Sequence, residues 1–123
     1  MNKTKEIRSI LFSDEFNEFR DLLDTRTQNK VDANVSILKT VYLLSAKFVK
    51  RIVNTSLYEM RVSVGFSEYR TILFAIDHEN VIQSTKIILL NGFLKKSSKD
   101  YDKQIKKAIN ILNKLDYDTE IRP

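Results

Sequence analysis

The amino-acid sequence predicts an α+β fold in which helices cover one face of a small antiparallel or mixed sheet and leave the other face partly open. Two observations predict it. Apolar residues recur at helical spacing near both ends of the chain, and β-branched and aromatic residues accumulate between residues 57 and 93. Helices and strands that are separated in this way are typical of the α+β class. The length of 123 residues fits a single domain spanning residues 1–123.

The N-terminal third is expected to contain one strand and two helices. The apolar run at residues 7–12 suits a strand, and Ser13 can cap the helix that follows. Thr25 followed by Gln28 forms a capping-box pattern that opens a second helix. The two buried helix faces are marked by apolar residues at helical spacing, namely Phe16, Phe19, Leu22 and Leu23, then Val31, Val35, Leu38 and Tyr42. The helices should therefore form an antiparallel pair on one face of the sheet.

Three more strands and a final helix are expected in the remainder. The strands are predicted at residues 58–64, 69–76 and about 87–93, and the last of them is apolar on both faces, as a central strand would be. Residues 43–55 have no clean periodicity, and we interpret them as the end of the second helix and a connection. The final helix is marked by Ile105, Ala108, Ile109, Leu112 and Leu115. The predicted order is β-α-α-β-β-β-α.

Composition restricts the possible chemistry. The chain has no cysteine, which excludes disulfides, thiolate nucleophiles and cysteine-ligated zinc. Its single histidine, His78, falls in a predicted turn, so we expect no metal and no cofactor. The N-terminal apolar run is interrupted too early for a signal peptide, and no segment approaches the roughly 20 apolar residues of a membrane helix. A cytoplasmic protein without membrane contact is expected.

The charge of the chain indicates an anionic partner. The formal net charge is +5, and seven lysines stand against two aspartates between residues 86 and 107. Clustered basic charge attracts phosphate backbones and makes binding dependent on salt. The alternative is a solvated helix face that is rich in lysine.

Two arginines in the predicted strands indicate a phosphate site. Side chains alternate across a strand, so the side chain of Arg61 is expected to point away from the core. Arg70 lies at the end of a strand face that is otherwise apolar, a position that suits the floor of a cleft. The segment after residue 92 is placed to bring Lys95 and Lys96 to the same cleft. Several fixed cations around one concavity match the charge of a phosphoryl transition state. The alternative is that both arginines are exposed rim residues that only maintain solubility.

Three short motifs follow one another along the chain: Tyr58-Glu59-Met60-Arg61, then Tyr69-Arg70, then Leu90-Asn91-Gly92-Phe93-Leu94-Lys95-Lys96. With the order of elements and the amphipathic final helix, they resemble the RelE/ParE toxin superfamily, and within it the HigB-like, or phage-derived Gp49-like, branch. The resemblance extends over nearly the whole chain. It implies a RelE-like fold with two N-terminal helices on one sheet face.

The resemblance also implies a function. Such proteins are bacterial type II toxins that enter the ribosomal decoding site and cut messenger RNA, and a cognate antitoxin, expected to be a helix-turn-helix HigA-like protein, holds them inactive. The 2′-hydroxyl attacks the adjacent phosphate without a metal. Carried over by motif position, Arg70 would stabilise the phosphoryl oxygens and Arg61 would orient the backbone. Lys95 or Lys96 would supply a second cation or the acid. Further candidates are Tyr101 for catalysis, and Lys50, Arg51, Lys99 and Lys103 for contacts with RNA or the ribosome.

Two other functions are compatible with this resemblance. The ParE branch shares the fold but poisons DNA gyrase by binding, and a toxin fold that has lost its chemistry would bind RNA or antitoxin without cutting. Basic residues at strand ends favour the nuclease, because a toxin that acts by binding needs no phosphate pocket. Glu59 is better explained as a partner of Arg61 or a neighbouring strand residue than as a base, and His78 as a structural or exposed residue.

Overall fold

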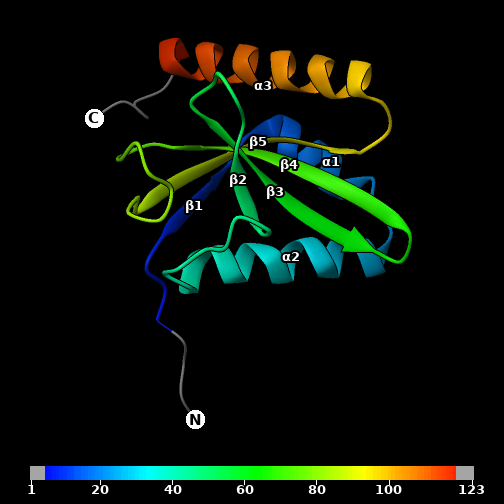
Figure 1. The fold of residues 1–123 in the computed structure, drawn as a ribbon, viewed down its shortest axis with the longest axis horizontal. Coiled ribbons are helices and arrows are strands. Elements are labelled where there is room, and N and C mark those ends of the chain that lie inside the picture. Colours follow the sequence, from blue (N-terminus) through cyan, green and yellow to red (C-terminus); the bar gives the residue numbers. More distant parts are fainter. Residues whose placement is uncertain (1–4, 119–123) are drawn as a thin grey trace.

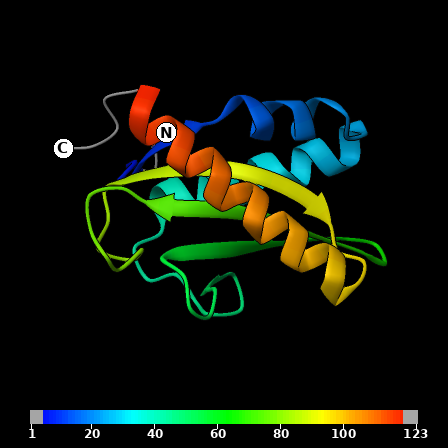
Figure 2. The same cartoon turned by 90° about the horizontal axis from the view of Figure 1, so that it is seen from above.

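A computed structural model of the chain describes residues 5–118, which form three layers (Figure 1). The elements in chain order are β1 (Ser9–Phe12), α1 (Asp14–Asp21), α2 (Thr25–Thr40), β2 (Val49–Arg51), β3 (Leu57–Val64), β4 (Ser67–Ala75), β5 (Lys86–Leu94) and α3 (Ser98–Asp118). Helices α1 and α2 pack on one face of the sheet, and α3 crosses the other face obliquely (Figure 2). The predicted α+β class is confirmed. Residues 1–4 and 119–123 of the predicted domain lie outside the described residues.

The sheet has five strands in the order β1-β5-β4-β3-β2. β1 pairs with β5 in parallel, and the other three pairs are antiparallel, so the sheet is mixed as predicted. The predicted interior position of residues 87–93 is confirmed, because β5 lies between β1 and β4. The pairing of β3 with β4 places Arg61 directly opposite Arg70. None of the described helices has the length and apolar character needed to span a membrane.

The fifth strand, β2, was not predicted. It lies within residues 43–55, so the interpretation of this segment as a helix end and a connection is wrong. Only Val49 of its three residues is buried, and so short an edge strand carries no alternating pattern that reveals it. Its pairing with β3 sets Lys50 opposite Glu59, which brings basic residues of this segment to the edge of the sheet beside Arg61.

The helix starts match the prediction at one cap and differ at the other. Ser13 caps α1 as predicted, because its Oγ accepts a hydrogen bond of 3.0 Å from the main chain of the first turn. Asp24, not Thr25, caps α2, and its carboxylate accepts a hydrogen bond of 2.8 Å from the Thr27 amide. Aspartate is as good an N-cap as serine, so the helix begins one residue earlier than the pattern indicates. The helix also ends before Tyr42, which is exposed rather than buried.

The second face of the sheet packs against α3, so the expectation that helices cover only one face of the sheet is wrong. Ile105, Ala108 and Ile111 of α3 are buried against apolar residues of β3, β4 and β5. Ile111 takes the place predicted for Ile109, which is exposed. What remains open on this face is a pocket at one end of the sheet, bordered by the first turn of α3.

The loop between β4 and β5 is organised by one carboxylate. Asp77 accepts hydrogen bonds from the hydroxyls of Ser84 and Thr85 and from the amides of Thr85 and Lys86, the latter two at 2.9 and 3.0 Å. Burial on its own would raise the pKa of Asp77, but these hydrogen bonds favour the charged form and lower the pKa well below its usual range. The loop therefore depends on the ionised carboxylate.

This arrangement predicts an acid-dependent loss of stability. A carboxyl whose folded pKa is depressed stabilises the fold above its unfolded pKa of about 3.9, and that stabilisation is lost as the pH falls below it. Asp77→Asn should therefore lower the Tm at pH 7 by a few degrees and make the Tm depend less on pH below about 4. Calorimetric melting across pH 2–7 measures both effects, with the exposed Glu79→Gln in the same loop as control. Equal pH profiles for wild type and Asp77→Asn would contradict this account.

Candidate active site

A pocket of about 330 Å³ lies where β2, the middle of β3, the start of β4 and the segment between β5 and α3 meet. Six basic residues line it, namely Lys50, Arg51, Arg61, Arg70, Lys95 and Lys96. Glu59 is the one carboxylate among the described lining residues, and Tyr101, Ser97 and Ser98 contribute hydroxyls. The pocket therefore concentrates positive charge around a single acidic group, an arrangement that suits a phosphate.

Glu59 lies at the centre of the polar contacts in this pocket. Its Oε2 atom is 3.1 Å from Nε of Arg70 and 3.8 Å from Nε of Arg61, and its Oε1 atom accepts a hydrogen bond from the hydroxyl of Tyr101. The carboxylate is almost completely buried, which makes these contacts costly to break. The alternation of Glu59, Arg61 and Ser63 on β3 produces this geometry, because it points the first two residues to the α3 face. The expected pairing of Glu59 is confirmed, and its closest basic partner is Arg70.

Arg70 forms the floor of the pocket. Its side chain is only 6% exposed, and it lines the pocket while pairing with Glu59 on one side and Glu68 on the other. The Nη1 atom donates to Oε1 of Glu68 at 3.3 Å and to the carbonyl of Tyr69 at 3.1 Å. A guanidinium held by two carboxylates and a carbonyl has little freedom to reorient, so its charge is fixed in place. The alternative that Arg70 is an exposed rim residue is wrong.

Arg61 and Tyr101 complete the walls of the pocket. The Arg61 side chain is 38% exposed, so it reaches solvent at the mouth while its Nε atom stays near Glu59. Burial, together with the hydrogen bond to the Glu59 carboxylate, raises the pKa of the Tyr101 hydroxyl well above its ordinary value of about 10. Tyr101 is therefore protonated at neutral pH. It can pass on a proton through Glu59 but cannot act alone as a base.

The remaining cations of the pocket are exposed and lie on its rim. Lys95 and Lys96 follow β5, and the Lys95 amide donates to the Glu68 carbonyl at 2.7 Å, which fixes where this segment leaves the sheet. On the opposite rim, Lys50 and Arg51 come from β2, and Nε of Arg51 donates to the carbonyl of Thr55 at 3.2 Å. Exposed ammonium and guanidinium groups at a rim suit contacts with a phosphate backbone.

Two of the predicted RNA contacts do not join this pocket. Lys103 lies on α3 in a separate shallow groove with Lys106, Lys107 and Lys114, and Lys99 is exposed outside the pocket lining. The run of lysines between residues 86 and 107 is therefore divided in space, because only Lys95 and Lys96 of that run line the pocket. The structure thus brings together seven of the nine predicted site residues.

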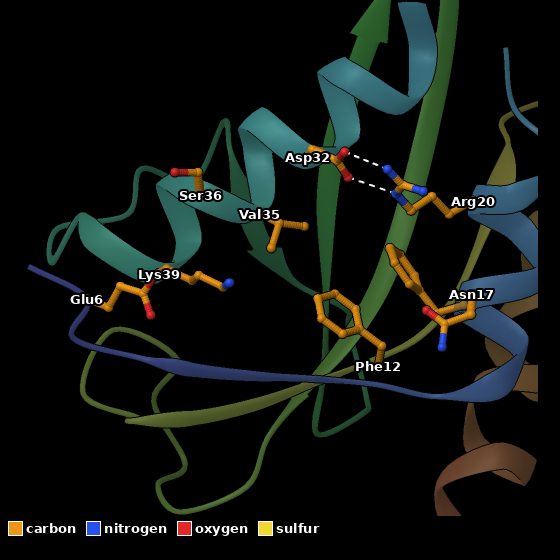
Figure 3. Close-up of a pocket in the computed structure, with 9 residues that line it drawn as sticks. Glu6, Phe12, Asn17, Arg20, Asp32, Val35, Ser36 and Lys39 are labelled. Carbon is orange, nitrogen blue, oxygen red and sulfur yellow. Dashed lines mark hydrogen bonds and ion pairs between the residues drawn. The ribbon is translucent and has the colours of Figure 1, made fainter. Parts of the chain in front are cut away.

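A second hollow, of about 400 Å³, lies between β1, α1 and α2 (Figure 3). Figure 3 shows Arg20 of α1 facing Asp32 of α2, and the two side chains are joined by hydrogen bonds of 2.8 and 2.6 Å. Its charges are balanced, since Arg20 and Lys39 stand against Glu6 and Asp32. This hollow offers no surplus positive charge for a phosphate, and we do not assign a site to it.

Comparison with known proteins identifies the family. The family described as "Phage derived protein Gp49-like" matches residues 17–113. This range includes all three motifs, the five elements from α2 to β5, and most of α1 and of α3. The chain belongs to the Gp49-like family. This confirms the branch predicted from the motifs, and the family is of the toxin-antitoxin type, which implies an antitoxin as partner. No significant match was found among curated proteins or among solved structures.

Some motif residues of the Gp49-like protein have structural roles. A Cβ atom on Gly92 would lie 2.3 Å from the ring of Phe19, so any other residue here would displace that ring, which packs α1 on β5. Asn91 is buried and donates to the carbonyl of Gln104 on α3 at 3.2 Å.

His78 is exposed in the β4–β5 loop, where its Nδ1 atom accepts a hydrogen bond from the Asn80 amide at 2.9 Å. Among the described residues, no cluster of three or more His, Asp or Glu side chains could hold a metal ion.

Sequence reasoning missed two further pocket residues, Ser97 and Ser98. Ser97 accepts a hydrogen bond of 3.1 Å from the Asp100 amide, as the N-cap of α3. The signal for it was present, because a serine that precedes a helical pattern is a typical cap. Its capping role fixes the first turn of α3, and thereby the position of Tyr101 against Glu59.

Proposed function

We propose that this Gp49-like protein is the toxin of a type II toxin-antitoxin pair and that it cuts messenger RNA on the ribosome. The observation that carries the proposal is the pocket in which Arg70 and Glu59 are buried together beneath a rim of exposed cations. A toxin that acted by binding alone would need no fixed, buried cation at the bottom of a small polar pocket.

The cations divide into two roles by their exposure. Arg70, held by Glu59 and Glu68, faces the phosphoryl oxygens and stabilises the negative charge that grows on them during the reaction. Arg61, half exposed at the mouth, orients the phosphate group. The rim residues Lys50 and Arg51 hold the neighbouring backbone.

Proton transfer uses groups on opposite sides of the phosphate. The attacking 2′-oxygen and the departing 5′-oxygen lie roughly in line through phosphorus, so two groups that are hydrogen-bonded to each other cannot serve both. Tyr101 and Glu59 are such a pair, and we assign both to the 2′-hydroxyl side. The 2′-hydroxyl proton passes to the Tyr101 oxygen while the Tyr101 proton passes to Glu59. As the bond from the 2′-oxygen to phosphorus forms, the bond to the 5′-oxygen breaks, and Lys95 or Lys96 protonates that oxygen.

The ribosome and the antitoxin are the proposed partners. A pocket of this size holds little more than one phosphate and its neighbours, so the ribosome is expected to present the RNA to it. The exposed Lys99 and Lys103 add contacts with the RNA or the ribosome outside the pocket. A helix-turn-helix antitoxin that masks the pocket or blocks ribosome entry would silence the toxin, and an acidic surface on it would speed association.

Lys95→Ala and Lys96→Ala, made separately, should identify the acid. The lysine that protonates the 5′-oxygen should lower the rate of single-turnover cleavage by about 10²-fold or more when it is removed, because general acid catalysis contributes 10²–10⁴-fold. The other lysine should change mainly the affinity for RNA. Both side chains are exposed, so neither variant should alter the Tm by more than a few degrees. Cleavage within a few-fold of wild type for both variants would contradict the role given to this segment.

Induced expression in a bacterial host tests the proposed function as a whole. We expect growth arrest, with messenger RNAs cut only while they are translated, so that an initiation inhibitor protects them. Co-expression of the antitoxin should restore growth. Intact transcripts together with stalled DNA replication would overturn the proposal in favour of a gyrase poison. Growth without cleavage of RNA would indicate a toxin fold that has lost its chemistry.

A further inference from the structure

One large apolar side chain stands entirely in solvent at the tip of the β3–β4 hairpin. Phe66 is fully exposed, at 109% of its reference area, and no other large apolar residue of residues 5–115 is as exposed. A ring in this position contributes no buried area to the fold. Single exposed apolar residues are common on protein surfaces, so the position of Phe66 has to be considered together with its surroundings.

The turn holds Phe66 in a defined place. Val64 and Ser67 form the last pair of the hairpin, so the loop consists of Gly65 and Phe66 alone. Gly65 has a φ of +60°, and Phe66 is not among the described residues with positive φ, which is the pattern of a type II′ turn. Two-residue turns of this type match the twist of the strands, so the pairing of the strands continues up to the turn. The hairpin therefore presents the ring on a short, well-defined support.

This support lies at the same end of the sheet as the cationic pocket. Phe66 is two residues from Glu68, whose carbonyl accepts the 2.7 Å hydrogen bond from the amide of Lys95. From the spacing of residues along and between strands, the Cα atoms of Phe66 and Lys95 lie within roughly 12 Å of each other. In Figure 1 the hairpin tip and the chain entering α3 are at the same end of the molecule.

We propose that Phe66 stacks on an unpaired base of the RNA whose phosphate occupies the pocket. The inference rests on the proposed function and adds a subsite to it. Six cations against one carboxylate select a polyanion, and among polyanions a nucleic acid also offers flat aromatic faces. Stacking on aromatic side chains tolerates any base, since every base has a π face. Phe66 thereby fixes the register of the strand without selecting its sequence.

The absence of tryptophan from the chain provides a direct test. Phe66→Trp gives a protein with a single tryptophan at the proposed subsite. The matched control is Leu43→Trp, which is 76% exposed and follows α2. Arg8 ties that segment to the β4–β5 loop, since it donates to the carbonyls of Tyr42 and Ile82, so Leu43 lies at the far end of the sheet from the hairpin. A short unstructured RNA at low salt should quench the emission of Phe66→Trp and leave that of Leu43→Trp unchanged.

Two further measurements separate stacking from charge. Inorganic polyphosphate, which has no bases, should displace labelled RNA but should not quench Phe66→Trp. Phe66→Ala should weaken RNA binding by about tenfold, measured by anisotropy, and Phe66→Tyr should restore it.

RNA that binds with unchanged affinity to Phe66→Ala, or without quenching Phe66→Trp, would overturn the stacking subsite and leave the proposed function intact. RNA that binds to none of the variants would also overturn the subsite, whereas the proposed function fails only if messenger RNA stays intact on the ribosome. Loss of antitoxin binding alone in Phe66→Ala would assign the ring to the antitoxin.

Discussion

Replacing Arg70 with alanine should lower the rate of single-turnover RNA cleavage by about 10²-fold or more, roughly the effect of losing one preorganised donor to the transition state. The side chain is only 6% exposed and is held by Glu59 and Glu68, so its charge is already in position before the reaction begins. Arg70→Lys should restore part of the activity, because an ammonium keeps the charge but cannot reproduce the planar fork of the guanidinium. Cleavage in a reconstituted translation reaction measures both variants.

The stability of the Arg70 variants must be measured alongside activity. Removing one partner of a buried ion pair costs about 3–5 kcal/mol, because the other charge is left uncompensated. Arg70→Ala is therefore expected to be less stable than wild type, and Arg70→Lys is the more informative variant. Arg20→Ala is a suitable control, since Arg20 also pairs with a carboxylate but lies outside the pocket. If Arg70→Lys melts and cleaves like wild type, the planar fork is not needed at this position. If folded Arg70→Ala also cleaves within a few-fold of wild type, Arg70 has no role in catalysis.

Replacing Glu59 with glutamine should reduce cleavage by a similar factor of about 10²-fold, for a different reason. The amide cannot take the proton that Tyr101 passes on, so the path from the 2′-hydroxyl is interrupted. Glu59→Gln should also lower the pKa of Tyr101 toward its ordinary value of about 10, because the carboxylate contributes to raising it. NMR titration with the five tyrosines labelled and assigned follows this pKa.

A second carboxylate serves as the control for this prediction. Glu68 also pairs with Arg70, at 3.3 Å, but it is not part of the pocket lining. Glu68→Gln should leave the pKa of Tyr101 unchanged and should lower cleavage much less than Glu59→Gln. If the two variants lose activity equally, the contribution of Glu59 is only to neutralise Arg70, and the proposed proton path is wrong.

Much of the fold could be predicted from the sequence, because its main signals are local. The helical spacing of Val31, Val35 and Leu38 and the alternation on either side of Gly65 are readable without tertiary information. β2 could not be predicted, because it is a strand only through its pairing with β3 and has one buried residue. The side of the sheet that α3 covers was also not predictable from its own pattern, since an amphipathic helix shows which of its faces is buried but not what it packs against.

The sequence predicted most residues of the candidate site, but not the contacts that these residues make with one another. The two arginines and the lysine pair could be found because their strands and motifs are recognisable, and the register of β3 and β4 then places Arg61 beside Arg70. The central position of Glu59 depends on contacts with Arg70 and Tyr101, which lie 11 and 42 residues away along the chain. Proximity in sequence was misleading for Lys103, because helical geometry turns it away from the pocket that Tyr101 lines.

The chemistry of the cut ends tests the central claim most directly. Purified protein should be added to a reconstituted translation reaction, and the 3′ ends of the messenger RNA fragments analysed by mass spectrometry. Attack by the 2′-hydroxyl predicts a 2′,3′-cyclic phosphate or its opened phosphate product, and a 2′-deoxy nucleotide at the cleaved position should block the cut. Fragments with 3′-hydroxyl ends, or cutting that continues at the 2′-deoxy position, would contradict the mechanism assigned to the Arg70 and Glu59 pocket.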